Sequence, residues 1–266
     1  MSEAYTIEVD GLVAKYGERT ILHGVDLKVR PGEVRVILGG SGSGKSTLLK
    51  HIIGLMRPAG GQVRLLGVDL AQADEPEKNA VLGHIGMLFQ GGALLNSMTL
   101  LENVELPLVE RTELPKDVIR EMARMKLAML GLEHATHLFP PELSGGMKKR
   151  AALARAMALD PAVLFCDEPS AGLDPITAAA LDETLLGLRD QFGMSVVVVT
   201  HELASVETIS DRVLMLYKGE VLADGPLPEV KRTDHPMVRA FFERHEEAEV
   251  TGHASVWQAM GEGRPA

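Results

Sequence analysis

Residues 39–47 carry the clearest chemical signal in the sequence. They read Gly-Gly-Ser-Gly-Ser-Gly-Lys-Ser-Thr and match the pattern G-x-x-x-x-G-K-[ST]. Glycines let the backbone curl until several N–H groups point at one anion, so such a loop can wrap phosphates. In this pattern Lys45 reaches the β- and γ-phosphates, and the Ser46 hydroxyl binds Mg²⁺. The stretch predicts a nucleoside triphosphate site formed by Gly39, Gly40, Ser41, Gly42, Ser43, Gly44, Lys45, Ser46 and Thr47.

Polar residues follow two apolar runs further along the chain. Asp167 and Glu168 follow the run at 162–166, and His201 follows the run at 195–200. In parallel sheets, ligands bind at the carboxyl ends of the strands. There Asp167 can hold Mg²⁺, and a carboxylate such as Glu168 can polarise an attacking water. Strand alternation is expected to point Glu168 away from Asp167, and His201 is placed to contact the γ-phosphate.

The elements that must position these residues are mostly strands. A strand at 34–38 precedes the phosphate loop, and a helix at 46–53 follows it with the positive end of its dipole at the phosphates. Alternating and short apolar runs predict further strands. A turn is expected at Lys15-Tyr16-Gly17, and the strand at 85–89 ends at Gln90. These further strands are expected at residues 7–12, 25–29, 62–66, 68–70, 85–89, 162–166, 195–200, 213–217 and 220–224.

The pattern changes between residues 101 and 137, where helical spacing replaces alternation. Residues 118–130 combine helical spacing with good helix formers, and Gly131 is expected to end that helix. A second helix is expected at 147–159. We interpret this region as a helical insertion in an α/β domain.

Composition limits the partners. The chain of 266 residues has a net charge of −10, which argues against a nucleic-acid partner. Its one cysteine, Cys166, excludes an internal disulfide, and neither a secretory signal nor an apolar run long enough to span a membrane is expected. Any membrane role is therefore expected to work through a partner. Beyond about residue 244 the chain is acidic and is expected to form a loosely held tail.

These motifs, in this order, resemble the ATPase subunits of ATP-binding cassette (ABC) transporters over about residues 7–242. Leu143-Ser144-Gly145-Gly146 resembles their signature, placed shortly before Asp167. The resemblance implies an α/β P-loop NTPase core with an N-terminal antiparallel β subdomain and an inserted α-helical subdomain. The implied nucleotide-binding domain covers residues 5–243 with the helical insertion at about 95–160, followed by a tail at 244–266.

The resemblance also assigns roles to individual residues. It implies that Tyr16 stacks on adenine and that Gln90 senses Mg²⁺ and the membrane partner. Ser144, Gly145 and Gly146 would close the ATP site of a second copy. In this chain Met147 stands where the family usually has Gln.

The remaining implied roles concern catalysis and the dimer. Lys45, Glu168 and His201 are the implied catalytic residues, and the implied metal ligands are Ser46, Gln90 and Asp167. Asp174 lies in the segment 170–174, which resembles the loop that joins the two halves of the dimer. ATP and Mg²⁺ are the implied substrate and cofactor.

A closer resemblance lies at residues 89–104 and 51–55, which are similar to cassettes that serve mammalian-cell-entry (MCE) phospholipid transporters, the lipid-asymmetry group. It implies a peripheral homodimer at the cytoplasmic face of the inner membrane. The implied partners are a membrane permease, an MCE-domain protein and small cytoplasmic accessory subunits, with no nucleic acid. A cassette for an amino acid or a metal, or a soluble cassette that remodels nucleic acid or ribosomes, remain the alternatives.

Overall fold

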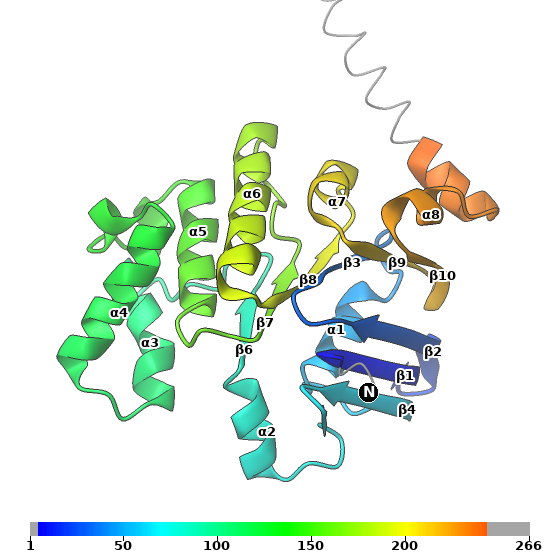
Figure 1. The fold of residues 1–266 in the computed structure, drawn as a ribbon, viewed down its shortest axis with the longest axis horizontal. Helices are drawn as coiled ribbons and strands as arrows, with labels where there is room; N and C mark the ends of the chain where they lie inside the picture. The colour runs from blue at the N-terminus through cyan, green and yellow to red at the C-terminus, as the bar shows by residue number, and fades with distance from the viewer. Residues whose placement is uncertain (1–4, 244–266) are drawn as a thin grey trace, which may run out of the picture.

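The structure is a computed structural model that describes residues 5–243. The predicted tail at 244–266 lies outside the described residues. Two sheets and their helices make up the described part, with helices α3 and α4 at one end and strands β1, β2 and β4 at the other (Figure 1). Within residues 5–243, none of the helices combines the length and the apolarity needed to cross a bilayer.

The smaller sheet is antiparallel and has the strand order β2-β1-β4-β5. Its strands are β1 (Ile7–Tyr16), β2 (Arg19–Val29), β4 (Gly60–Leu65) and β5 (Val68–Asp69). The turn predicted at Lys15-Tyr16-Gly17 begins two residues later, at Gly17. Lys15 and Tyr16 continue β1, and Tyr16 pairs with Arg19 across a turn of Gly17 and Glu18. The hairpin therefore extends both predicted strands and carries Tyr16 on its tip.

The larger sheet has the order β10-β9-β3-β8-β7-β6, and all neighbours pair in parallel except β10 with β9. Its strands are β3 (Val34–Leu38), β6 (Ile85–Leu88), β7 (Val163–Asp167), β8 (Ser195–Thr200), β9 (Arg212–Tyr217) and β10 (Glu220–Gly225). Every residue of β3 and β8 is buried, as expected for parallel strands covered on both faces. The register aligns Leu38 with Thr200 and Asp167 with Val199, so the carboxyl ends of β3, β8 and β7 are neighbours.

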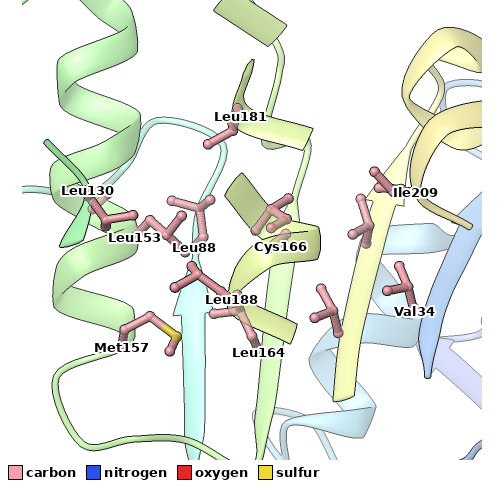
Figure 2. Packing of buried hydrophobic residues seen from close by; sticks show 14 of the residues in the cluster. Val34, Leu88, Leu130, Leu153, Met157, Leu164, Cys166, Leu181, Leu188 and Ile209 are labelled. Carbon is pink, nitrogen blue, oxygen red and sulfur yellow. The ribbon is translucent and has the colours of Figure 1, made fainter. Parts of the chain in front are cut away.

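Helices cover both faces of the larger sheet. On one face, α1 (Lys45–Ile52) fills the space between the two sheets, because Leu48 and Ile52 share a core cluster with residues of both. On the other face, Leu153 of α5 and Leu188 of α6 belong to a second core cluster together with Leu88 of β6 and Leu164 of β7 (Figure 2). The helices of this face are α5 (Gly145–Ala156), α6 (Pro175–Phe192) and α7 (Leu203–Ile209).

The helical insertion consists of α3 (Leu100–Arg111), α4 (Lys116–Met129) and two short 3₁₀ turns that lead into α5. The helix predicted at 118–130 agrees with α4 within two residues. The helix predicted at 147–159 is shifted, because the Ser144 side chain accepts a hydrogen bond from the Met147 N–H and caps a helix that begins at Gly145. The remaining helices are α2 (Glu75–Leu82), α8 (Leu227–Lys231) and one at 236–243.

Candidate nucleotide site

The phosphate loop, residues 39–47, connects β3 to α1 by a path that only glycine permits at two positions. A Cβ atom on Gly39 would lie 2.3 Å from the carbonyl oxygen of Leu216. Gly44 has a φ of 110°, and a Cβ there would lie 2.6 Å from the side chain of Leu22. The loop therefore packs against its surroundings closely enough to fix its backbone, which leaves its N–H groups preorganised for an anion.

Lys45 folds back over this loop. Its ammonium donates hydrogen bonds to the carbonyl oxygens of Gly39 at 2.6 Å and Gly40 at 3.1 Å. Burial lowers the pKa of Lys45, and the nearby carboxylates of Glu168 and Asp167 oppose that shift. The ammonium thus lies between the loop and two acidic groups, where a phosphate can be bound on one side and a metal ion on the other.

A cavity of about 300 Å³ adjoins the loop and is lined by Tyr16, Arg19, Ile21 and residues 42–47. Ser43 is 4% exposed, and its buried hydroxyl has no hydrogen-bond partner among the described residues. A buried hydroxyl without a partner costs free energy, and a nucleotide phosphate would supply an acceptor. The loop and its cavity therefore fit a nucleotide with phosphates.

The Tyr16 ring has the exposure that a base-stacking role requires. It is 47% exposed, and its hydroxyl donates a hydrogen bond to the Met56 sulfur at 3.2 Å. Arg19 lines the same cavity from the opposite side of the turn. Arg19 carries no signal in the sequence, because an arginine in a hairpin turn has no motif around it.

Asp167 and Glu168 lie at the end of β7, but they are oriented by different means. Burial and the neighbouring Glu168 raise the pKa of Asp167, while the charge of Lys45 lowers it. Glu168 has a φ of 47°, so it has already left the strand. The prediction that strand alternation orients Glu168 is therefore wrong, because the left-handed backbone at Glu168 sets the direction of its side chain.

The turned backbone brings Glu168 to His201. The two Glu168 carboxylate oxygens lie 2.9 and 3.0 Å from His201 Nδ1, and the Thr200 hydroxyl donates to the same carboxylate at 3.3 Å. The Glu168 N–H donates to the carbonyl of Val199 in β8. Two residues that are 33 positions apart thus form one acid–base pair beside the phosphate loop.

Gln90 is exposed and follows β6, next to β7 in the sheet. Its carbonyl oxygen accepts a hydrogen bond from Lys149 of α5, at 2.5 Å. The same ammonium donates to the carbonyl of Glu168 at 3.1 Å. The role of Lys149 has no signal in the sequence, because a lysine between Lys148 and Arg150 is typical of a solvated helix face.

The signature residues lie elsewhere. Among the described residues, no hydrogen bond or ion pair joins Ser144, Gly145 or Gly146 to the phosphate loop. A Cβ on Gly146 would lie 2.7 Å from the Thr177 side chain, so this helix start packs tightly on α6. Asp174 caps α6 by accepting hydrogen bonds from Thr177, and those bonds lower its pKa.

Comparisons with known proteins agree on the family. The profile described as "ABC transporter" matches residues 22–171. The intermembrane phospholipid transport system ATP-binding protein MlaF of Haemophilus influenzae is 40% identical over 219 residues, which cover 82% of this chain and 83% of MlaF. The probable ribonucleotide transport ATP-binding protein mkl of Mycobacterium tuberculosis is 40% identical over 237 residues. That match covers 89% of this chain but only 66% of the mycobacterial protein.

Solved structures agree on the fold. A dimeric ATP-binding cassette in a post-hydrolysis state, bound to ADP and phosphate, superposes with a TM-score of 0.75 at 34% identity, covering 83% of this chain and 98% of that one. The cassette cbiO1 of Clostridium perfringens gives a TM-score of 0.80 at 28% identity, covering 94% and 100%. These matches confirm the predicted mixed α/β cassette fold. With a family profile over more than half of its length, the chain belongs to the ABC transporter family, as one of its ATP-binding cassettes.

Proposed function

We propose that this chain hydrolyses ATP with Mg²⁺ as one of two identical cassettes that drive phospholipid movement by a membrane permease. One observation carries the catalytic part. Glu168 and His201 pair at 2.9 Å at the ends of neighbouring strands, beside a loop shaped for phosphates. This placement suits a carboxylate that polarises water and an imidazole that orients it toward the γ-phosphate.

The proposed chemistry divides the site into three parts. The phosphate loop and Lys45 hold the β- and γ-phosphates, and Ser46, Asp167 and Gln90 are the groups that would hold Mg²⁺. The metal ion would neutralise phosphate charge when bound. Glu168 then accepts the proton of a water that attacks the γ-phosphorus, while ADP leaves. The partly buried carboxylate of Asp167, with its raised pKa, is best satisfied by a cation, which supports its role as a metal ligand.

The dimer completes the site. Among the described residues, Ser144, Gly145 and Gly146 make no hydrogen bond to the phosphate loop of their own chain. A second copy placed head to tail would bring its signature to the γ-phosphate. The N-terminus of α5 would then add positive potential there. Asp174 lies in the proposed joining loop and packs beside the same helix start. The ADP-bound dimeric cassette reported above supports this arrangement.

Replacing Glu168 with Gln tests the catalytic assignment. The amide keeps the shape and the contact to His201 but cannot take a proton, so turnover should fall at least about 100-fold. ATP binding should stay within about threefold, because the phosphate contacts are untouched, and an ATP-bound dimer should accumulate in size-exclusion chromatography. Normal turnover in the variant would exclude Glu168 as the base.

The substrate assignment rests on relatives and on the segment after Gln90. The MlaF relatives are covered at 83% of their length or more, and a chloroplast relative in Arabidopsis thaliana carries a name built on a galactolipid. The mycobacterial relatives are named for ribonucleotide transport and extend well beyond this chain. We favour phospholipid because residues 89–104 resemble the lipid group and the chain spans most of the MlaF proteins.

The permease is proposed to dock in a groove next to Gln90. The groove encloses about 430 Å³, and its lining includes Phe89, Ala93, Leu106 and Pro107. Phe89 is 41% exposed, which is unusual for a phenylalanine at a strand end. Leu94, in contrast, packs against the core and is not free to bind a partner. An MCE-domain protein, small accessory subunits and the cytoplasmic face of the inner membrane complete the proposed assembly.

Replacing Leu106 with Glu tests docking and substrate together, with Met125→Glu as the control elsewhere in the helical insertion. The Leu106 variant should keep ATP affinity within about twofold but lose copurification with the permease, since a charge in an apolar groove is costly. Cells carrying it should show a weakened lipid barrier and no nutrient requirement. A nutrient auxotrophy with an intact barrier would reject phospholipid in favour of a small solute such as a ribonucleotide.

A further inference from the structure

Lys149 is a buried cation on the signature helix, and its two partners belong to two other motifs. It lies in α5, one turn after the signature, and is only 6% exposed. Its ammonium donates to the carbonyl oxygens of Gln90 and Glu168, at 2.5 and 3.1 Å. A single side chain thus joins the signature helix to the loop after β6 and to the end of β7.

The energetic role of such a contact follows from its burial. Burial lowers the pKa of Lys149, and surrounding acidic groups, Glu202 and Glu168 among them, oppose the shift. A buried ammonium needs acceptors, and here both acceptors are backbone carbonyls rather than a carboxylate. The ammonium therefore fixes backbone positions. At Glu168 the fixed backbone is the left-handed one, with a φ of 47°, that turns the carboxylate toward His201.

We propose that Lys149, which lies on the signature helix α5, is a positioning residue that holds the backbone of Gln90 and Glu168 in the same chain. This inference rests on the proposed function, in which that helix serves the partner's ATP while Gln90 and Glu168 serve the chain's own. When α5 docks on the partner's nucleotide, its movement is passed through Lys149 to Gln90, the chain's own metal-binding residue, and to Glu168, its own hydrolytic residue. Lys149 is the physical link between the two ATP sites.

The first test needs no activity. Lys149→Met keeps the length and the apolar stem but removes all donors, and Lys148→Met removes a neighbouring charge as the control. Charged hydrogen bonds of this kind are strong enough that amide exchange should quicken about tenfold in segments 90–93 and 168–173 of the Lys149 variant. Exchange within α5 should not change. Wild-type exchange in both segments, or equal acceleration within α5, would overturn the proposal.

The second test places the substitution on one side of a mixed dimer. One chain carries Lys45→Ala and the other Ser144→Arg, so the intact site combines the phosphate loop of the Ser144 variant with the signature of the Lys45 variant. Lys149→Met in the chain that supplies the phosphate loop should lower kcat about tenfold and leave KM within about twofold. The same substitution in the other chain should leave both within about twofold.

The two placements separate positioning from general packing. Equal losses in both, or a loss only in the chain that supplies the signature, would overturn the role assigned to Lys149. An inactive mixed dimer without any change at Lys149 would instead count against the composite site. In that case the hydrogen-exchange result still decides whether Lys149 positions the two segments.

Discussion

At the scale of residues, the carboxyl of Asp182 is buried in surroundings that disfavour its charged form. It lies on α6 and is 2% exposed, and its Oδ1 atom has no hydrogen-bond partner among the described residues. Burial raises the pKa of Asp182, a hydrogen bond with Ser205 lowers it, and the charge of Glu202 raises it further. The balance is a raised pKa, which means that folding disfavours the ionised form.

This raised pKa predicts a pH-dependent effect of Asp182→Asn. A carboxyl whose folded pKa lies above its unfolded value of about 3.8 contributes stability below that value, and loses it as pH rises through the folded pKa. The amide has no charge to bury. The melting temperature of the variant, relative to the wild type, should therefore rise between about pH 4 and pH 7.5. Parallel melting curves at all pH values would contradict this account of Asp182.

The proposed site residues could be selected from the sequence, but the residues that support them could not. Lys45, Asp167 and His201 could be selected because each follows an apolar run that reads as a strand, and parallel strands collect their ends at one edge. Lys149 and Asp182 sit on helices among other charged or polar residues, so the sequence indicates a solvated face. Their burial depends on packing between α5, α6 and α7, which no local pattern encodes.

At the scale of elements, Asn103 holds the segment after Gln90 in place. It is fully buried in α3. Its side-chain oxygen accepts from the Leu95 N–H at 2.8 Å, and its amide donates to the carbonyls of Leu95, Met98 and Thr99. One side chain therefore ties residues 95–99 to the start of α3, beside the proposed permease groove.

Replacing Asn103 with Ala should destabilise the chain by about 2 kcal/mol, because buried backbone groups lose their partners. Urea unfolding of the wild type and the variant measures the difference. A surface control on the same helix, Glu110→Ala, should stay within about 0.5 kcal/mol. If Asn103→Ala unfolds at the wild-type midpoint, the segment at 95–99 is held by other contacts.

Element types were easier to predict than their limits. The apolar runs at 34–38 and 195–200 are strands with those bounds, because fully buried parallel strands leave a continuous apolar signal. The shifted start of α5 could have been found from Ser144, a strong N-cap residue. The helix α6 was not among the expected elements, although Asp174 and Pro175 are a cap and a first-turn signal. The turn at Glu168 has no sequence signal, since a non-glycine residue in left-handed backbone depends on its neighbours.

At the scale of the whole molecule, the larger sheet separates the phosphate loop from the signature. The phosphate loop lies between the sheets with α1, and the signature begins α5 on the opposite face of the larger sheet. In the proposed dimer, a single chain therefore contributes to two sites without completing either. The resemblance implied that the signature serves a second copy, whereas composition and local patterns could not place the signature and the phosphate loop on opposite faces of the sheet.

Each ATP site is proposed to need residues from two chains, and ATP hydrolysis by a mixed dimer tests this. Lys45→Ala and Ser144→Arg chains, each inactive alone, are given different tags, combined and isolated as heterodimers. The heterodimer should turn over ATP clearly faster than either variant alone and at most at about half the wild-type rate, since only one of its two sites is intact. Confirmed heterodimers that hydrolyse no more ATP than either variant alone would contradict the proposal.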